Sequence, residues 1–398
     1  TIGVVLAAMS LGTPAQGGDI AGWKHNPASA HDGAGVPVDW SDAGHQAWST
    51  PMPAKANSTP LVIDGRVLTT AEPFQLICVD AETGNVLWQH DHSADEALAA
   101  SGEHEAMTEA QKLVFEQKQN RIAELDREAR GLFRQARRDP DARARLDVIQ
   151  AEASELKSEI GPQLAAAGVV PVTHDTNGYA SPSPATDGEH VYVFFGNGVA
   201  ASYDLEGNRR WITIAQIPTH RWGVSATPQL VDGVVVVLVD DLIGLDAQTG
   251  EELWRVKQQH SFGSPTVGDL GHGPFIITPK GLFVDPRDGR ELGGVADVEL
   301  EYNVPLFVDG TVYFIYEKAI AFTLTQDADG DINATELWQA SIRGDRHYAS
   351  PVIHDGLIYA VSRREDVTVL KMQTGEVVHE SKAGLDIRGS MYGSPVIA

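Results

Sequence analysis

The sequence predicts an all-β propeller that is interrupted by one inserted α-helical hairpin. A unit of about 43 residues recurs along the chain, and this is the period of a four-stranded propeller blade. Several units carry a tryptophan at a constant distance from a Thr-Gly turn. Between the first and second units the apolar period changes from about two residues to about three and a half, which is typical of paired helices.

Each unit opens with a small residue and a proline, and an Asp-Gly turn follows. The openings are Ser58-Thr59-Pro60, Ser181-Pro182, Thr227-Pro228, Ser264-Pro265, Val304-Pro305, Ser350-Pro351 and Ser394-Pro395. Asp-Gly pairs such as Asp232-Gly233 supply the positive φ of a tight hairpin turn. The β-branched run at 234–237 is typical of a strand packed between two neighbouring blades.

The second half of the unit carries the more specific signal. It reads Asp80-x-x-Thr83-Gly84-x-x-x-Trp88 in one copy and Asp246-x-x-Thr249-Gly250-x-x-x-Trp254 in another, with a shorter form from Asp204 to Trp211. This resembles the tryptophan-docking motif of the pyrroloquinoline-quinone-like (PQQ-like) propeller family, which includes quinoproteins and a propeller lipoprotein of outer-membrane assembly. The resemblance implies seven or eight blades, with each indole stacked on the next blade. Gly293 and His379 replace the tryptophan in two repeats.

The insertion spans residues 93–172. Two apolar series step by three and four residues, and Asp139-Pro140 separates them. The series are Ile122, Leu125, Ala129, Leu132 and Ala136, then Leu146, Ile149, Ala153, Leu156 and Ile160. We expect an antiparallel hairpin with these seams facing each other. It either covers a blade edge or docks another protein.

Four segments follow from these patterns. Residues 1–17 are expected to be the remnant of a signal peptide, with a buried strand as the alternative, and residues 18–92 the propeller start and first blade. Residues 93–172 form the hairpin and 173–398 the remaining blades. Trp48 is expected in a strand that closes the ring on the last blade. We expect the chain to be a fragment at both ends.

Composition excludes some functions. The chain has 55 acidic and 30 basic residues and a formal charge of −25, which opposes binding to nucleic acid. No apolar run is long enough to span a bilayer. The single cysteine, Cys78, lies in an apolar strand pattern and is predicted to be a buried small hydrophobe.

The loops that lead into the blades converge on one mouth of a propeller, so their side chains can act together. The candidate ligand-binding residues are His174, His220, Arg221, His260, Arg346, His347 and Arg388. Such a cationic cluster suits a small anionic ligand, and the alternative is that each side chain bonds its own loop. Five aromatic residues of these loops are expected to pack around the rim: Tyr179, Phe262, Tyr302, Tyr348 and Tyr392.

The resemblance to quinoproteins also implies what a dehydrogenase would need. Its members hold a calcium ion with acidic and amide side chains, use an aspartate base, and often carry two adjacent cysteines. This sequence has one cysteine, and no calcium-ligand set aligns with it. The acidic segment from Asp327 to Asp331 lacks the glycine and glutamate of a calcium loop. We therefore expect no metal and no cofactor, with PQQ and calcium as the alternative, and the catalytic residues stay unknown.

These observations predict an exported protein, periplasmic or secreted and without a membrane span, that acts as a binding or scaffolding module. The expected partners are another protein at the helical hairpin and a small anionic ligand at the mouth. The alternative is a PQQ-dependent dehydrogenase of alcohols or sugars.

Overall fold

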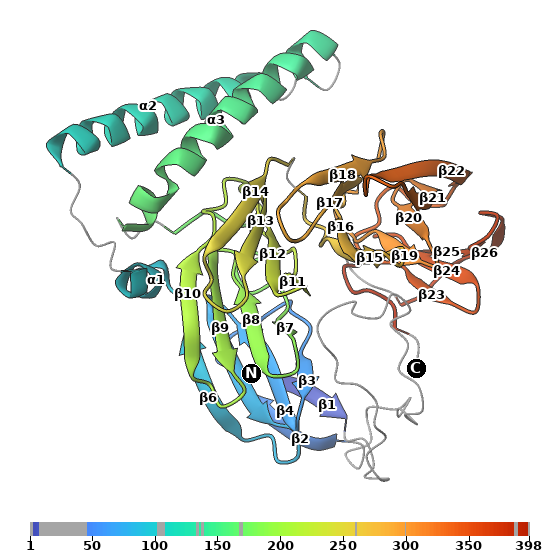
Figure 1. Ribbon diagram of the computed structural model, residues 1–398, viewed down its shortest axis with the longest axis horizontal. Coiled ribbons are helices and arrows are strands. Elements are labelled where there is room, and N and C mark those ends of the chain that lie inside the picture. Colours follow the sequence, from blue (N-terminus) through green and yellow to red (C-terminus); the bar gives the residue numbers. More distant parts are fainter. Residues whose placement is uncertain are drawn as a thin grey trace.

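The computed structural model describes residues 3–7, 46–101, 108–132, 135–136, 139–166, 170–258, 261–298, 300–385 and 389–396. Strands β3 to β26 form six four-stranded antiparallel sheets, and in each sheet the strands are neighbours in both sequence and space. Figure 1 shows these sheets as successive blades, from blue to red along the chain.

The strands of the first three blades are β3 (Leu61–Ile63), β4 (Arg66–Ala71), β5 (Gln75–Asp80), β6 (Val86–Asp91); β7 (Ala185–Thr186), β8 (His190–Phe194), β9 (Val199–Asp204), β10 (Arg209–Ile214); β11 (Gln229–Val231), β12 (Val234–Leu238), β13 (Leu242–Asp246) and β14 (Glu252–Val256). Those of the last three are β15 (Thr266–Asp269), β16 (Pro274–Ile277), β17 (Leu282–Val284), β18 (Glu291–Gly294); β19 (Leu306–Val308), β20 (Thr311–Ile315), β21 (Lys318–Gln326), β22 (Ile332–Ser341); β23 (Val352–His354), β24 (Leu357–Val361), β25 (Asp366–Lys371) and β26 (Val377–Lys382).

The blades pack face to face around their short first strands. β11 lies beside β7 and β15, and β15 lies beside β19. One hydrophobic cluster joins Tyr192 of the second blade, Val236 of the third and Ile276 of the fourth. The predicted all-β propeller class is therefore confirmed, and six blades lie within the described residues. The expectation of seven or eight blades stays a prediction.

Asp-Gly turns join the first and second strands of four blades. Asp232 has a φ of 48° and Gly233 a φ of 75°, and Val231 pairs with Val234 across them. Two consecutive residues with positive φ make the type I′ turn whose twist matches that of a β-hairpin. The Asp-Gly motif therefore folds as its sequence predicts.

Five tryptophans dock on the blade that follows them, and the fourth blade, with Gly293 in place of a tryptophan, has no such contact to the fifth among the described residues. Their indole Nε1 groups donate to backbone carbonyls: Trp48 to Ala81 (2.9 Å), Trp88 to Leu205 (3.1 Å), Trp211 to Ala247 (3.0 Å), Trp254 to Pro286 (2.8 Å) and Trp338 to Met372 (2.8 Å). Each ring also covers a glycine of the same turn. A Cβ built on Gly250 would lie 2.6 Å from the Trp211 ring, so only glycine fits there without a shift.

Trp48 lies on β2 (Gln46–Pro51), which pairs antiparallel with β1 (Gly3–Ala7). Because Trp48 docks on the first blade as Trp88 docks on the second, β2 takes the place of an outer strand preceding the first blade. This position agrees with the expected closing strand, although β2 pairs here with β1 and not with β26. Within residues 1–17 the structure describes strand β1, and both the signal-peptide assignment and its buried-strand alternative stay predictions.

Hydroxyl groups before the blade-opening prolines form a second series of contacts between blades. Backbone N–H groups donate to them as follows: Thr59 to Ser183 (2.8 Å), Ser183 to Thr227 (3.1 Å), Thr227 to Ser264 (2.8 Å) and Ser350 to Ser394 (2.9 Å). The second blade thus opens at Ser183-Pro184 and not at Ser181-Pro182. Two Ser-Pro pairs follow each other there, and the local pattern could not separate them.

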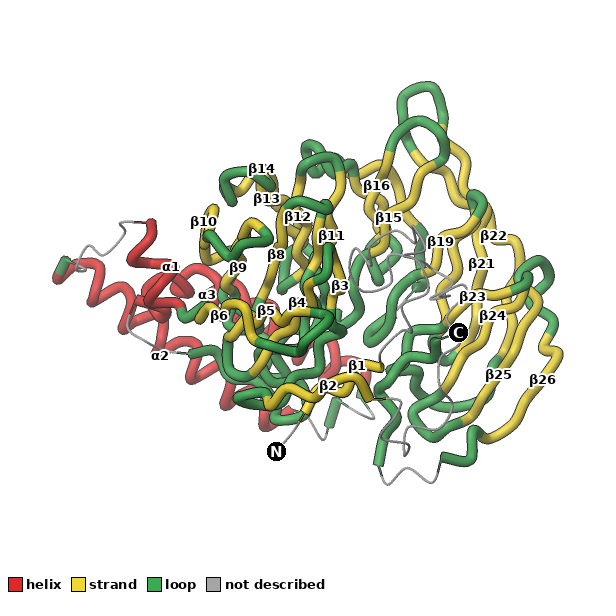
Figure 2. Tube along the Cα trace, turned by 90° about the horizontal axis from the view of Figure 1, so that it is seen from below, coloured by secondary structure: helices red, strands yellow, loops and turns green. Residues whose placement is uncertain are grey.

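Three helices lie between β6 and β7: α1 (Ala94–Ser101), α2 (Glu109–Leu132) and α3 (Pro140–Ala166). Figure 2 shows them together on one side of the strands. Asp139 caps α3, because its side chain accepts a hydrogen bond from the backbone N–H of Asp141 (3.0 Å). Pro140 is the first residue of α3. The Asp139-Pro140 pair therefore starts a helix, as well as ending the apolar series that precedes it. No helix in the described part of the chain is long and apolar enough to cross a membrane.

Helices α2 and α3 pack antiparallel through the predicted seams. Their buried core consists of Leu125, Ala129, Leu146, Ile149 and Ala153. Exposed ion pairs flank it, with Lys118 bonded to Glu159 (2.7 Å) and Lys157 to Asp126 (3.1 Å). Because such exposed pairs contribute at most about 1 kcal/mol each, the apolar seam accounts for most of the pairing.

Candidate functional site

A cleft of about 1780 Å³ lies between the helical hairpin and the mouth of the propeller. Its propeller side consists of the loops before the blades, with the blade-opening hydroxyls at its floor. Its other side consists of α2 and α3. The hairpin contributes to this site because the chain leaves β6 and returns to β7 at the same face of the propeller.

Four aromatic side chains line the mouth side of the cleft, and we call them the aromatic arc: Phe262, Tyr302, Tyr348 and Tyr392. The rings of Phe262 and Tyr302 stack at 5.9 Å, those of Tyr302 and Tyr348 meet edge to face at 4.7 Å, and those of Tyr348 and Tyr392 stack at 4.8 Å. Burial raises the pKa of Tyr302, so its hydroxyl stays protonated. Tyr179 lies elsewhere, against Phe74 at 5.0 Å.

Arg346 lies over the arc. Its guanidinium is 6.0 Å from the centre of the Tyr302 ring, and Nη1 donates to the Tyr348 hydroxyl over 3.4 Å. A guanidinium at this distance from an aromatic face is held by a cation–π attraction of about 0.5–1 kcal/mol at an exposed site. The predicted candidate Arg346 therefore lines the cleft, is exposed, and forms no ion pair within the described residues.

The loop between β10 and β11 brings three further side chains to the cleft. His220 meets Phe262 edge to face at 5.3 Å, and Arg221 and Trp222 follow it. His174 stacks on Trp222 with ring centres 3.8 Å apart, at the rim of the site. The Arg221 side chain is exposed, and it makes no hydrogen bond or ion pair within the described residues.

His347 lies in the interior. Its backbone carbonyl accepts from Asn303 Nδ2 (3.0 Å), and it does not line the cleft. Burial lowers the pKa of its ring to about 4, so the ring is neutral near pH 7. His260 and Arg388 lie outside the described residues. Of the seven candidates, the structure thus brings His220, Arg221 and Arg346 together, with His174 beside them.

The cleft carries charges of both signs, so it is less positive than the sequence suggested. On the hairpin side Lys157 pairs with Asp126 (3.1 Å) and Arg143 with Asp147 (3.1 Å), while Arg130 has no ion pair among the residues described. The sequence identified the hairpin, but its periodicity did not say which helical face turns toward the mouth. Arg130 was missed for that reason.

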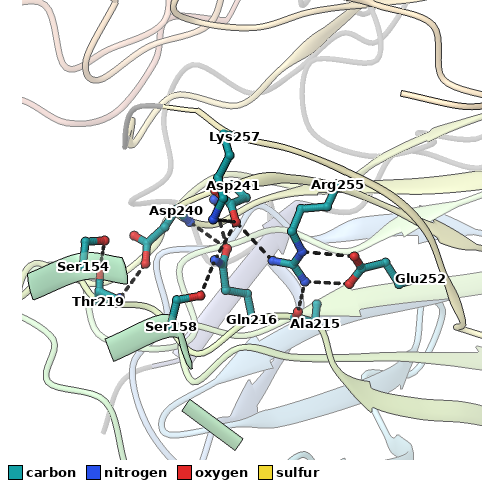
Figure 3. Close-up of polar contacts among 10 residues, drawn as sticks. All are labelled: Ser154, Ser158, Ala215, Gln216, Thr219, Asp240, Asp241, Glu252, Arg255 and Lys257. Carbon is teal, nitrogen blue, oxygen red and sulfur yellow. Dashed lines mark hydrogen bonds and ion pairs between the residues drawn. The ribbon is translucent and has the colours of Figure 1, made fainter. Parts of the chain in front are cut away.

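Polar contacts fix the base of α3 to the second and third blades (Figure 3). The Ser154 and Thr219 hydroxyls are 2.9 Å apart, and Gln216 Nε2 donates to Ser158 Oγ over 3.3 Å. Gly161 permits close packing, because a Cβ there would lie 3.0 Å from Cβ of Ile217.

Gln216 connects these contacts to a buried carboxylate. Its Oε1 accepts from the backbone N–H of Asp241 (2.9 Å), and its Nε2 donates to the Asp241 carboxylate (3.0 Å). Arg255 and Lys257 each approach this carboxylate to 3.3 Å. Because the buried charge is paired and hydrogen-bonded, it is tolerated and holds the loop under α3 in one geometry.

The described residues do not fit PQQ with its calcium ion. No group of three or more His, Cys, Asp or Glu side chains among them is arranged to hold a metal ion. Cys78 lies buried in the first blade, where burial raises the pKa of its thiol to about 12. In the acidic turn of the fifth blade, Asp327 Oδ1 accepts from the backbone N–H of Asp329 (3.0 Å), and Arg290 pairs with Asp331 (2.7 Å). These carboxylates are already engaged within the protein.

Comparison with known proteins gives one family and one fold. The family described as outer membrane protein assembly factor BamB matches residues 7–147 and 165–381. BamB from Moraxella catarrhalis has a similar structure, with a TM-score of 0.51, 15% identity and coverage of 88% of this chain and 83% of that chain. A europium-containing methanol dehydrogenase gives a TM-score of 0.52, 11% identity and coverage of 88% and 74%. At these identities the structural likeness shows the fold alone. No curated protein matches the sequence.

Proposed function

The chain belongs to the family of the outer membrane protein assembly factor BamB, and we propose that it acts as an exported binding and scaffolding module in outer membrane protein assembly. The observation that carries the proposal is the cleft between the hairpin and the mouth. With a volume of about 1780 Å³, it exceeds the roughly 300–1,000 Å³ of ordinary small-molecule pockets. A segment of another protein fits such a site better than a metabolite does.

The residue types at the mouth support a protein partner. Arginine, tryptophan and tyrosine are enriched among the few residues that contribute most of the binding energy of a protein interface. The cleft presents Arg221, Trp222 and Arg346 next to the aromatic arc, and Trp222 is 38% exposed. In this proposal the arginines pair with carboxylates of the partner. The predicted anionic-ligand site is then a site for acidic side chains of another protein.

Site-specific photocrosslinking tests the proposal. A photoreactive phenylalanine analogue at Trp222 is expected to crosslink one defined component of the outer-membrane assembly apparatus in cells. The matched control carries the analogue at Leu253, which is 49% exposed on the outer strand β14 and does not line the cleft. If both positions give the same products, or Trp222 gives none, the mouth is not the partner surface.

The quinoprotein alternative has its own test. Titration with PQQ and calcium, followed by dye reduction with an alcohol panel, reports both binding and turnover. The scaffold proposal expects neither. Saturable quinone binding with turnover would replace it by a dehydrogenase, which the described donor set does not favour.

A further inference from the structure

The two sides of the cleft present arginines that have no carboxylate partner among the described residues. Arg130 of α2 lies on the hairpin side, and Arg221 and Arg346 lie on the mouth side. Two other basic residues of α2 are paired: Lys118 with Glu159, and Arg121 with Glu152 at 2.8 Å. Asp240 and Glu301 also line the mouth side, but neither is ion-paired with these three arginines among the described residues. In a chain with a formal charge of −25, cations on both sides of the cleft therefore favour an acidic occupant.

The hairpin is held in a way that suits a fixed wall. The contacts of Ser154 and Ser158 attach α3 to the loop at 215–219, and Gln216 of that loop is hydrogen-bonded to the buried Asp241 (Figure 3). Gly161 allows α3 to pack closely on Ile217 of the same loop. Helix α2 packs along α3 through the buried seam. These contacts join α2, through α3, to the loops of the mouth, and a wall that is attached in this way lowers the entropic cost of binding.

The shape and chemistry of the cleft select an extended polypeptide. Its volume suits several residues of chain, and its aromatic arc offers ring faces on which apolar or aromatic side chains can pack. A small anion would use the guanidinium groups but leave the arc uncovered. Guanidinium groups form paired hydrogen bonds with carboxylates, so acidic side chains along such a segment match the arginines on both walls.

We propose that the hairpin and the propeller mouth form a clamp that binds an extended acidic segment of a protein partner, with its carboxylates on Arg130 and on Arg221 and Arg346, and its aromatic side chains on the arc. The clamp rests on the proposed function and adds to it: the hairpin becomes half of the binding site, and the partner's chemistry is specified.

Fluorescence anisotropy with a defined peptide tests the clamp. The probe is a fluorescein-labelled peptide in which Asp and Tyr alternate with Ser, and the control peptide carries Lys in place of Asp. The full chain is expected to bind the acidic peptide and not the basic one. Arg130→Glu is expected to weaken binding about tenfold, since a charge-assisted hydrogen bond is lost and a repulsion is added.

Arg127→Glu is the matched control. Arg127 lies one turn away on α2, is exposed, and does not line the cleft, so this variant should bind within about twofold of wild type. Circular dichroism establishes that both variants keep their helices. If Arg130→Glu binds as wild type does while Arg221→Glu binds weakly, the mouth works alone and the clamp is wrong.

The other outcomes are also decisive. If the acidic peptide does not bind the wild-type chain, the clamp is wrong. The proposed function is then still tested separately, by the crosslinking at Trp222. Displacement of the peptide by free glutamate at an equal concentration of carboxylate would show that the cleft binds small anions and not an extended segment.

Discussion

Replacing Gly250 with alanine tests the tryptophan docking that holds the blades together. Gly250 has a φ of 76°, and an alanine Cβ there would lie 2.6 Å from the Trp211 ring. The backbone strain of a non-glycine residue at such a φ costs about 1–2 kcal/mol. The steric conflict with a packed indole adds about 1–3 kcal/mol, because the ring must shift off the turn and weaken its hydrogen bond to Ala247.

Gly233→Ala separates the two terms. Gly233 has nearly the same φ, 75°, but a Cβ built on it meets no atom within 4 Å. Its cost is therefore the backbone term alone, about 1–2 kcal/mol. Urea unfolding followed by tryptophan fluorescence and circular dichroism gives the free energy of unfolding of each variant. We expect Gly250→Ala to be the less stable variant by about 1–3 kcal/mol. Equal losses would refute the claim that contact with Trp211 demands glycine there.

Three further predictions concern buried groups. Gln216→Ala removes the amide that joins α3 to Asp241, and should increase hydrogen exchange in α3 while exchange in β20 stays unchanged. Cys78 should resist a thiol reagent at pH 8 in the native protein and react fully in urea, since burial raises its pKa to about 12; native reactivity would contradict the buried placement. The pKa of His347 is lowered from 6.5 to about 4, so the unfolded state takes up the proton first and stability should fall as pH drops through this window. His347→Gln should flatten that slope, and an unchanged slope would place the titrating group elsewhere.

The sequence predicted the parts of the fold that depend on local chemistry. The Asp-x-x-Thr-Gly turn is one example: the Asp246 carboxylate accepts from the backbone N–H and the hydroxyl of Thr249, at 2.8 and 3.1 Å. All the atoms that stabilise this turn lie within a few residues of each other in the sequence, so the turn can be recognised from the sequence alone. The indole that follows then has a defined partner in the next blade.

The missing tryptophan of the fourth blade has a physical reason that the sequence did not show. Gly293 stands in its place on β18, and a Cβ there would lie 2.3 Å from the backbone oxygen of Ile332 on β22. The lengthened hairpin β21–β22 lies so close to β18 that the backbones of β18 and β22 pack directly against each other. Sequence alone showed an eroded motif, whereas the structure shows a direct strand contact in its place.

Part of the candidate site could be predicted from the sequence. The residues of the mouth follow from the propeller fold, whereas the residues of the hairpin wall depend on contacts between distant parts of the chain. His220, Arg221 and Arg346 could be found because loops before propeller blades share one face, which is a property of the fold. The inward placement of His347, one residue after Arg346, depends on the local course of one loop. The placement of Arg130 depends on how α3 is anchored to the propeller. One anchoring contact joins Ser158 of α3 to Gln216, which lies 58 positions further along the chain, so no local sequence pattern reveals it.

The docking contacts between the first and second blades do not involve α2 or α3. Trp88 reaches Leu205, and the Thr59 N–H reaches Ser183, directly across the point where the insertion leaves and rejoins the propeller. Helices α2 and α3 bury their apolar seam against each other, and a few polar contacts and Gly161 join them to the loop at 215–219. Helices α2 and α3 therefore pack mainly on their own seam, and they also form one wall of the cleft. That arrangement explains how substitutions at Arg130 can report on binding without changing the propeller.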